Sequence, residues 1–287
     1  MVMNRSEDAV QEASSGYMTD ERRMIQEVAR DFTRNEVLPV ANELDPVQGD
    51  IPMDLRDKMG EMGYFGIRIP EEYGGLGLGV FEYCLIAEEL ARGWMSVASI
   101  IARAAGVMGV IGWPLEKRIE LTKKAAKGEY LAAVALSEPD AGSDLANVSC
   151  RAVLDGDEWV ITGSKYWCTF ADGADYIQVL CRVDSDEESR GRGLRSFLVE
   201  KNRGELPENV HGSPIPKIGY FGWKTYELAF DNCRIPKENV IGGDGTEGFK
   251  STVSGLEVAR AHTAARSIGL ARGALEAAVT YAQERDQ

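Results

Sequence analysis

The sequence predicts an α+β fold in three parts: an N-terminal α-helical domain over residues 1–130, a central β-domain over 131–241, and a helical segment over 242–287. Apolar residues recur at helical spacing in the first part, and short β-rich runs alternate with turn signals in the second. A single apolar stripe at helical spacing fills the third. A length of 287 residues suffices for the packed modules that such a division requires.

The first predicted helix begins after Thr19, a candidate N-cap, with Asp20 and Glu21 near the positive end of the helix dipole. Because proline does not continue a regular helix, we expect this helix to end at Pro39. Its apolar residues at near-helical spacing are Met24, Ile25, Val28, Phe32 and Val37. Shorter helices are expected over residues 53–62, 81–91, 96–109 and 116–126.

Two stretches of this half admit a second interpretation. The glycine-rich run 71–79 has the composition of a phosphate-binding loop, but it lacks the Lys-Ser/Thr ending and no strand precedes it, so a structural turn is favoured. The apolar stretch 93–115 contains Arg103, so we expect a buried helix there and no membrane span. The early acids Glu7 and Asp8 argue against a signal peptide.

Strands are expected in the central part over residues 131–136, 149–154, 159–162, 176–183, 194–200 and 226–230. Asp155-Gly156 marks a hairpin, and the acidic run 184–193 is expected to form a solvated loop. From Gly245 the pattern is helical up to the last residues, with no C-cap glycine. Since a lone amphipathic helix cannot bury its own stripe, we expect it to dock on the rest of the molecule and another subunit, or to be joined by further helices of a longer protein.

The composition excludes several classes of function. The 46 acids and 32 bases leave a net charge of −14, which argues against a nucleic-acid-binding surface, so an anionic ligand needs local basic groups or helix N-termini. The five cysteines are scattered without a CxxC pair, as is typical of reduced thiols in the cytoplasm. With two histidines and no His/Cys cluster, we expect no metal site.

The segment from Ser137 to Asp144 leaves a strand and enters a polar turn that reads Ser-Glu-Pro-Asp-Ala-Gly-Ser-Asp. Backbone N–H groups and hydroxyls in such a turn suit a pyrophosphate or the polar edge of a ring. An ordinary Asx-type loop is the alternative, and spacing alone does not separate the two.

This turn resembles the first signature of the acyl-CoA dehydrogenase family, departing from it at Asn147. Residues 163–169 (Gly-Ser-Lys-Tyr-Trp-Cys-Thr) are similar to the family's Gly-x-Lys-x-Trp-x-Thr element. Further resemblances follow in the family's order at residues 217–219, 230–232, 234–240, 242–248 and 281–287. The resemblance therefore covers the chain from about Thr19 to Gln287.

The resemblance implies an N-terminal helical domain, a central β-barrel-like domain and a C-terminal four-helix bundle of which this chain carries the first helix, with FAD held between them. Ser137 and Thr169 would place hydroxyls near the flavin, Thr169 by N5, and Trp167 would pack beside the isoalloxazine. From the residues alone, a core aromatic is the alternative for Trp167. The resemblance further implies roles for the backbone of Val134 and Leu136 at the pyrimidine edge and for Gly142 and Ser143 near the pyrophosphate or the coenzyme A arm.

The implied function is FAD-dependent α,β-dehydrogenation of an acyl-CoA thioester in fatty acid metabolism, with electrons passed to an electron-transfer flavoprotein. Arg285 and Gln287 would reach the FAD of a neighbouring subunit, so a cytoplasmic homotetramer built from dimers is expected. Two alternatives share the architecture: an oxygen-using acyl-CoA oxidase or flavin monooxygenase, and an inactive partner subunit that lacks the catalytic base.

No catalytic residue is assigned within the chain, because the family's usual catalytic glutamate would lie beyond residue 287. Some relatives carry it on the first C-terminal helix, directly before an arginine that resembles Arg260, a residue expected at the substrate. Here Ala259 stands before that arginine, and Glu257 lies on the wrong side of the helix. The chain by itself is therefore expected to be inactive.

Arg103 is a departure from the family pattern that admits two interpretations. Charges are rarely buried unpaired, so Arg103 pairs with Glu88 or Glu89, or it meets the second carboxylate of a dicarboxylic acyl-CoA. Residues 93–94, Arg103 and the loop 219–222 together resemble the methylsuccinyl-CoA dehydrogenase branch of the family.

Overall fold

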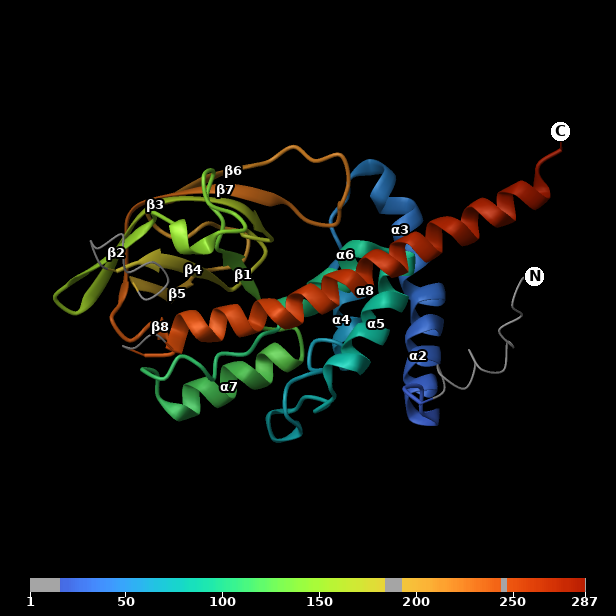
Figure 1. Cartoon of the computed structure of the whole chain (residues 1–287), viewed down its shortest axis with the longest axis horizontal. Coiled ribbons are helices and arrows are strands. Elements are labelled where there is room, and N and C mark those ends of the chain that lie inside the picture. Colours follow the sequence, from blue (N-terminus) through green and yellow to red (C-terminus); the bar gives the residue numbers. More distant parts are fainter. Residues whose placement is uncertain (1–15, 184–192, 244–246, 287) are drawn as a thin grey trace, which may run out of the picture.

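The computed structural model describes residues 16–183, 193–243 and 247–286. Figure 1 shows the sheet at one end of an elongated molecule, with α7 below it, helices α2 and α3 towards the other end, and helix α8 running along both. One continuous hydrophobic core extends from the helices into the sheet. The predicted α+β architecture, with helices first, a sheet in the middle and a long last helix, is confirmed.

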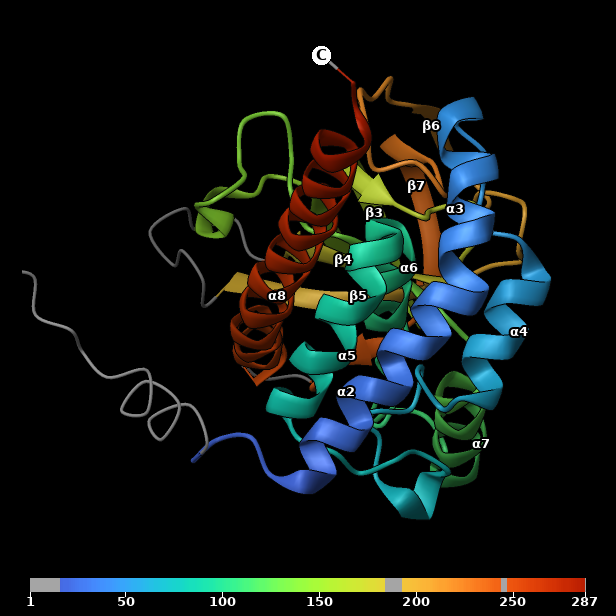
Figure 2. The ribbon, with the colours of Figure 1, turned by 90° about the vertical axis from the view of Figure 1, so that its right-hand side faces the viewer.

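The N-terminal part is helical from Asp20 onward, and the Thr19 hydroxyl accepts a hydrogen bond from the Arg22 N–H at 3.3 Å, as expected of an N-cap. Its α-helices are α2 (Asp20–Phe32), α3 (Leu38–Leu44), α4 (Met53–Glu61), α5 (Val80–Gly93), α6 (Met95–Ile100) and α7 (Leu115–Ala126). Figure 2 shows α5 between α2 and α8.

The prediction that the first helix ends at Pro39 is wrong. A π-helical turn (Thr33–Val37) joins α2 to α3, and Pro39 lies in the first turn of α3. A proline ring clashes with the carbonyl four residues earlier in a regular helix, and here that carbonyl belongs to the widened turn. The chain therefore stays helical through the proline.

The predicted helix over 96–109 is correct only in its first half. Helix α6 ends at Ile100, a 3₁₀ turn (Ile101–Arg103) follows, and Gly106 takes a left-handed conformation with φ +67°. The Thr122 hydroxyl then accepts the N–H of Val107 at 3.2 Å, which fixes the non-helical path. None of the helices in the described ranges is long and apolar enough to cross a membrane.

The glycine-rich run 71–79 is a structural turn, as favoured above. The N–H groups of Leu76, Gly77 and Leu78 donate to carbonyls of residues 66–69, so they are engaged within the turn. A Cβ on Gly75 would lie 2.0 Å from the Ile69 carbonyl oxygen. The close packing of two backbone segments explains the glycine there.

The central part forms an eight-stranded sheet in the order β6-β7-β3-β2-β4-β5-β8, with β1 added parallel to β4. Its strands are β1 (Ala132–Ala135), β2 (Arg151–Asp155), β3 (Glu158–Thr169), β4 (Tyr176–Arg182), β5 (Leu194–Glu200), β6 (Val210–Pro214), β7 (Thr225–Pro236) and β8 (Val240–Ile241). The predicted hairpin at Asp155-Gly156 joins β2 to β3. Most of the predicted loop 184–193 lies outside the described residues.

Strand β3 differs most from its prediction, because it continues past Thr162 to Thr169. Two register shifts against β7, at Ile161/Gly163 and Lys165/Cys168, let it bend, and Gly163 has φ +141° at the first of them. The extension brings the segment with Trp167 and Thr169 into the sheet.

Helix α8 (Glu247–Glu284) packs along α5, where Cβ atoms on Gly269 and Gly273 would lie 2.1 and 2.5 Å from the carbonyl oxygens of Glu88 and Arg92. The absence of side chains at these two positions lets the helix backbones approach. Apolar side chains farther along α8 stay exposed, namely Ile268, Leu270, Leu275, Val279 and Tyr281. The described chain therefore leaves part of the predicted stripe uncovered.

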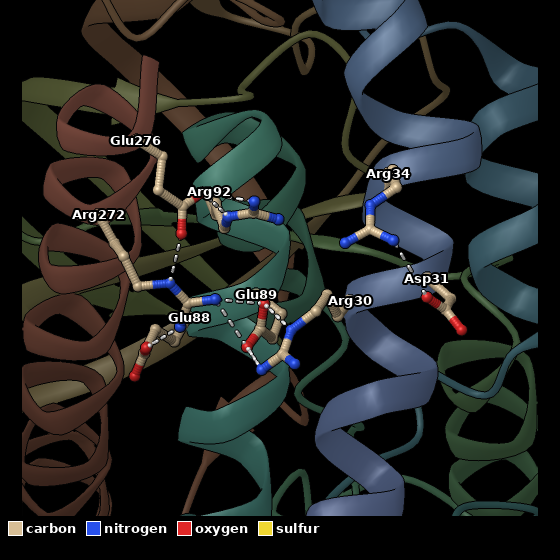
Figure 3. Close-up of polar contacts among 8 residues, drawn as sticks. All are labelled: Arg30, Asp31, Arg34, Glu88, Glu89, Arg92, Arg272 and Glu276. Atoms are coloured by element: carbon tan, nitrogen blue, oxygen red, sulfur yellow. Dashed lines mark hydrogen bonds and ion pairs between the residues drawn. The ribbon is translucent and has the colours of Figure 1, made fainter. Parts of the chain in front are cut away.

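An ion-pair network joins α2, α5 and α8 (Figure 3). Glu89 is 0% exposed and accepts hydrogen bonds from Arg30 at 3.0 Å and from Arg272 at 2.8 Å. Arg272 also donates to Glu88 at 2.7 Å. The predicted pairing of Arg103 with Glu88 or Glu89 is therefore wrong, since other arginines pair with both acids.

Candidate functional site

The polar turn after β1 is tied to strand β3 by a buried ion pair. Lys165 is 1% exposed, and its Nζ donates to Oε1 of Glu138 at 2.8 Å and to the Leu136 carbonyl at 3.0 Å. Glu138 also accepts the N–H groups of Ser149 at 2.7 Å and Cys150 at 2.9 Å. The buried carboxylate of Glu138 thus fixes the conformation of the turn.

The pKa of Glu138 reflects this arrangement. Burial alone raises the pKa of the carboxyl group, but the hydrogen bond from Lys165 and those from the backbone N–H groups outweigh it, so the pKa lies below its ordinary value. Sequence reasoning missed this pair, although strand alternation signals it. Lys165 lies four residues after buried Ile161, on the same face, where a lysine requires a buried partner.

Trp167 is not a core aromatic, because 56% of it is exposed. Its backbone has φ +64°, and its ring packs edge-on against Tyr166 with 5.0 Å between the ring centroids. The Tyr166 N–H donates to the Ser137 carbonyl at 2.8 Å, which holds the turn beside this part of β3. The half-buried hydroxyl of Thr169 lies 3.1 Å from that of Thr225.

The other residues expected at the cofactor divide into two groups. Gly142 and Ser143 are exposed on the turn, near Ser137 in the chain. Arg285 is exposed just after α8, at the end of the chain that points away from the sheet in Figure 1. Gln287 lies outside the described residues. The structure brings the first group, but not Arg285, to the turn.

A cavity of about 510 Å³ lies between the 101–110 segment, strands β1, β4 and β5, and the first turns of α8. Val134 and Leu136 line it, as does Ala259, whereas Arg260 is exposed beside it and absent from the lining. Most of the lining is apolar, and no aspartate or glutamate occurs among its described residues. Glu257 is exposed and lies outside the lining, so the described residues place no carboxylate base at the cavity.

The three segments linked by the Arg103 hypothesis meet in space. The Ser96 hydroxyl donates to the Phe221 carbonyl, and a Cβ on Gly222 would lie 3.2 Å from the Trp94 ring. The Arg103 guanidinium lies over the Trp223 ring at 5.4 Å. These contacts place Arg103 beside the loop that follows Gly219.

The residues of the turn and of β3 fit a flavin. An exposed indole offers a flat face for stacking, and the nearby hydroxyls of Ser137 and Thr169 offer hydrogen bonds to a polar ring edge. No metal-binding cluster of three or more His, Cys, Asp or Glu occurs in the described ranges.

Comparison with known protein families agrees with this chemistry. Models of the acyl-CoA dehydrogenase N-terminal, middle and C-terminal domains match residues 19–138, 133–233 and 246–287 in that order. The chain is also 31% identical to a glutaryl-coenzyme A dehydrogenase solved with glutaryl-CoA, with a TM-score of 0.83 over 94% of this chain and 68% of the other. The chain belongs to the acyl-CoA dehydrogenase family.

Two further family members are similar over most of the chain. (2S)-Methylsuccinyl-CoA dehydrogenase of Cereibacter sphaeroides is 39% identical over 277 residues, which cover 94% of this chain and 50% of that protein. A glutaryl-CoA dehydrogenase of Mycobacterium smegmatis, solved with FADH2, is 26% identical with a TM-score of 0.81, covering 95% of this chain and 68% of the other. The chain thus spans half the length of the first of these acyl-CoA dehydrogenases.

Proposed function

We propose that this chain is the flavin- and thioester-binding part of an acyl-CoA dehydrogenase, which removes the α-proton and the β-hydride of an acyl-CoA to form a double bond. The observation that carries the proposal is the exposed Trp167 beside a turn fixed by Glu138 and Lys165. An apolar cavity bordered by Leu136, one residue before that turn, has room for an acyl group. The electrons then pass to an electron-transfer flavoprotein.

FAD, when bound, supplies the ring that accepts the hydride. Trp167 would stack beside this ring, and Ser137 and Thr169 would donate hydrogen bonds to it. The backbone of Val134 and Leu136 would bind the pyrimidine edge, and Gly142 and Ser143 would bind the pyrophosphate or the coenzyme A arm. The structure of a glutaryl-CoA dehydrogenase with FADH2 supports the identity of the cofactor.

The apolar cavity excludes water from the thioester, which makes proton removal by a positioned carboxylate effective. Because the described lining contains no carboxylate, we propose that the base comes from a part of the protein outside this chain, and that the chain alone does not turn over. Arg260, beside the lining residue Ala259, is proposed to contact the substrate.

We further propose a cytoplasmic homotetramer. The exposed apolar residues of α8 provide a surface for further helices or for a second subunit. Arg285 and Gln287 are then available to the FAD of a neighbouring subunit. The free cysteines are consistent with a reducing compartment.

Chemical rescue tests the proposed function. The chain is loaded with FAD, and butyryl-CoA is added without oxygen, with and without formate as a substitute base. We expect butyryl-CoA alone to perturb the visible absorbance band of the oxidised flavin without bleaching it, and formate to permit slow bleaching. Coenzyme A alone is the control. If neither butyryl-CoA nor succinyl-CoA changes the band, with or without formate, the proposed function is wrong.

A further inference from the structure

Four buried side-chain nitrogens near one end of the cavity have no hydrogen-bond partner in the described structure. They are Nε of Arg103, Nε of Arg266, Nε2 of His262 and Nε1 of Trp223. Native structures leave few buried polar atoms unpaired, and each such atom has a specific cause, such as a catalytic role or a bound water or ion. Their concentration in one place therefore points to a ligand.

These four side chains belong to one cluster. The Arg266 Nη1 donates to the Tyr220 hydroxyl at 3.1 Å, and the Tyr220 ring lies 5.4 Å from the Trp223 ring, over which Arg103 sits. His262 stacks on Tyr83 with 4.3 Å between ring centroids. Helices α5 and α8, the turn after α6, and the loop before β7 all contribute to it.

The cluster carries positive charge without a counter-ion. Arg266 is only 9% exposed, and neither Arg266 nor Arg103 forms an ion pair with a carboxylate in the described ranges. On α5, Glu88 and Glu89 pair with Arg272, and Glu89 also pairs with Arg30. Buried charges normally have a partner of opposite sign, so these two guanidinium groups lack one.

The pKa of His262 is lowered by the same positive charges. Burial and the charges of Arg266 and Arg103 lower its pKa to about 3, although one ring nitrogen bonds to the Ala98 carbonyl. It is therefore neutral at ordinary pH and adds no charge. The formal charge of the cluster comes from the two arginines.

The cluster borders the cavity. Tyr83, which covers His262, lines the cavity, and so do Ala102 and Ala104 on either side of Arg103. The loop that carries Tyr220 and Trp223 is held by Lys217, whose ammonium donates to the carbonyls of both residues at 2.8 Å each. Arg103 and Arg266 are not themselves part of the lining, so the cluster lies directly behind the wall that Tyr83, Ala102 and Ala104 form.

We propose that Arg103 and Arg266 bind a second carboxylate on the acyl group, so that the substrates are coenzyme A thioesters of dicarboxylic acids. Guanidinium groups pair with carboxylates through charge-assisted hydrogen bonds, and the two free Nε–H groups are suitable donors. The hydroxyl of Tyr220, held by Arg266, adds a polar neighbour. This inference rests on the proposed function and specifies its substrate class.

Titration calorimetry with three probes tests the inference: succinyl-CoA, butyryl-CoA of the same acyl length, and coenzyme A alone. We expect the parent chain to bind succinyl-CoA more tightly than butyryl-CoA. Arg103→Gln and Arg266→Gln should weaken succinyl-CoA binding at least about tenfold and leave the other two probes nearly unchanged. Arg103→Lys and Arg266→Lys, which keep the charge, should weaken succinyl-CoA binding less than the glutamine substitutions do.

Arg118→Gln is the matched control, since Arg118 is also partly buried with an unpartnered Nε but lies on α7, outside the cluster. Equal losses for all three probes would mean that the arginines bind coenzyme A phosphates or support the fold, and would overturn the inference. A parent chain without preference for succinyl-CoA would also overturn it while leaving the proposed function intact. A folded parent that binds neither thioester would contradict both.

Discussion

Lys165 on β3 donates a hydrogen bond to Glu138 in the turn after β1, with 2.8 Å between Nζ and Oε1, and both side chains are buried. The pair joins the turn with Ser137 to the strand with Trp167. The same ion pair therefore stabilises the fold and fixes the two segments of the candidate flavin site.

Glu138→Gln should destabilise the chain by about 3–5 kcal/mol, because it leaves the Lys165 ammonium buried without a counter-charge. The folded-state pKa of Glu138 lies below its ordinary value, so its contribution is present above that ordinary value and is lost as the pH falls. Urea unfolding at neutral and acidic pH measures both effects. The exposed pair of Asp157 and Lys237 gives the control, and Asp157→Asn should change little. If Glu138→Gln and Asp157→Asn destabilise the chain equally, the buried pair has no special role in stability.

His262 should make the stability depend on pH. Its folded-state pKa is about 3, below the ordinary value of 6.5, so the folded state resists protonation and the stabilisation present above 6.5 is lost as the pH falls. Between pH 7 and pH 5 the loss should be about 2 kcal/mol. Unfolding measured at both pH values for the parent and His262→Gln checks this. A parent and a variant with the same pH slope would contradict it.

Two glycines of α8 should respond oppositely to alanine. In Gly269→Ala the new Cβ would lie 2.1 Å from the Glu88 carbonyl oxygen, so we expect a loss of about 1–3 kcal/mol as α8 moves away from α5. Gly255 has no atom within 4 Å of such a Cβ, and Gly255→Ala should gain about 0.5–1 kcal/mol from helix propensity. Thermal unfolding compares the two. A loss at both positions would argue against close packing as the cause.

Glu89→Gln should loosen α8 from the N-terminal helices, because Glu89 is fully buried between Arg30 and Arg272 (Figure 3). We expect a loss of about 2 kcal/mol or more, with faster proteolysis within α8. Glu276 is 43% exposed in its side chain and pairs with Arg92 and Arg272, so Glu276→Gln is the matched control with a smaller effect. Unchanged proteolysis in Glu89→Gln would show that the network does not hold α8.

Local rules predicted much of the fold. Thr19 caps a helix, Asp155-Gly156 turns a hairpin, and the strand over 194–200 has its predicted bounds, because each depends on neighbours in the sequence. Sequence reasoning failed where contacts between distant segments determine the local conformation. The π turn before Pro39 and the non-helical path after Arg103 depend on tertiary packing, and strands β6 and β8 are too short or too polar to show a pattern.

The candidate site shows the same division. The residues Ser137, Trp167 and Thr169 follow from sequence motifs, whereas the support from Glu138 and the cluster around Arg266 depend on contacts between segments far apart in the chain. The expected partner of Arg103 was wrong for this reason, since Glu88 and Glu89 are used by Arg272.

Binding of FAD to the chain, followed by quenching of flavin fluorescence, tests the central claim most directly. Trp167→Ala should weaken FAD binding by about 1–2 kcal/mol, because it removes the exposed aromatic face against which the ring packs. Phe81→Ala, at an exposed aromatic on α5 away from the turn, should leave FAD binding unchanged. If both variants bind FAD as the parent does, the turn and β3 are not the flavin site.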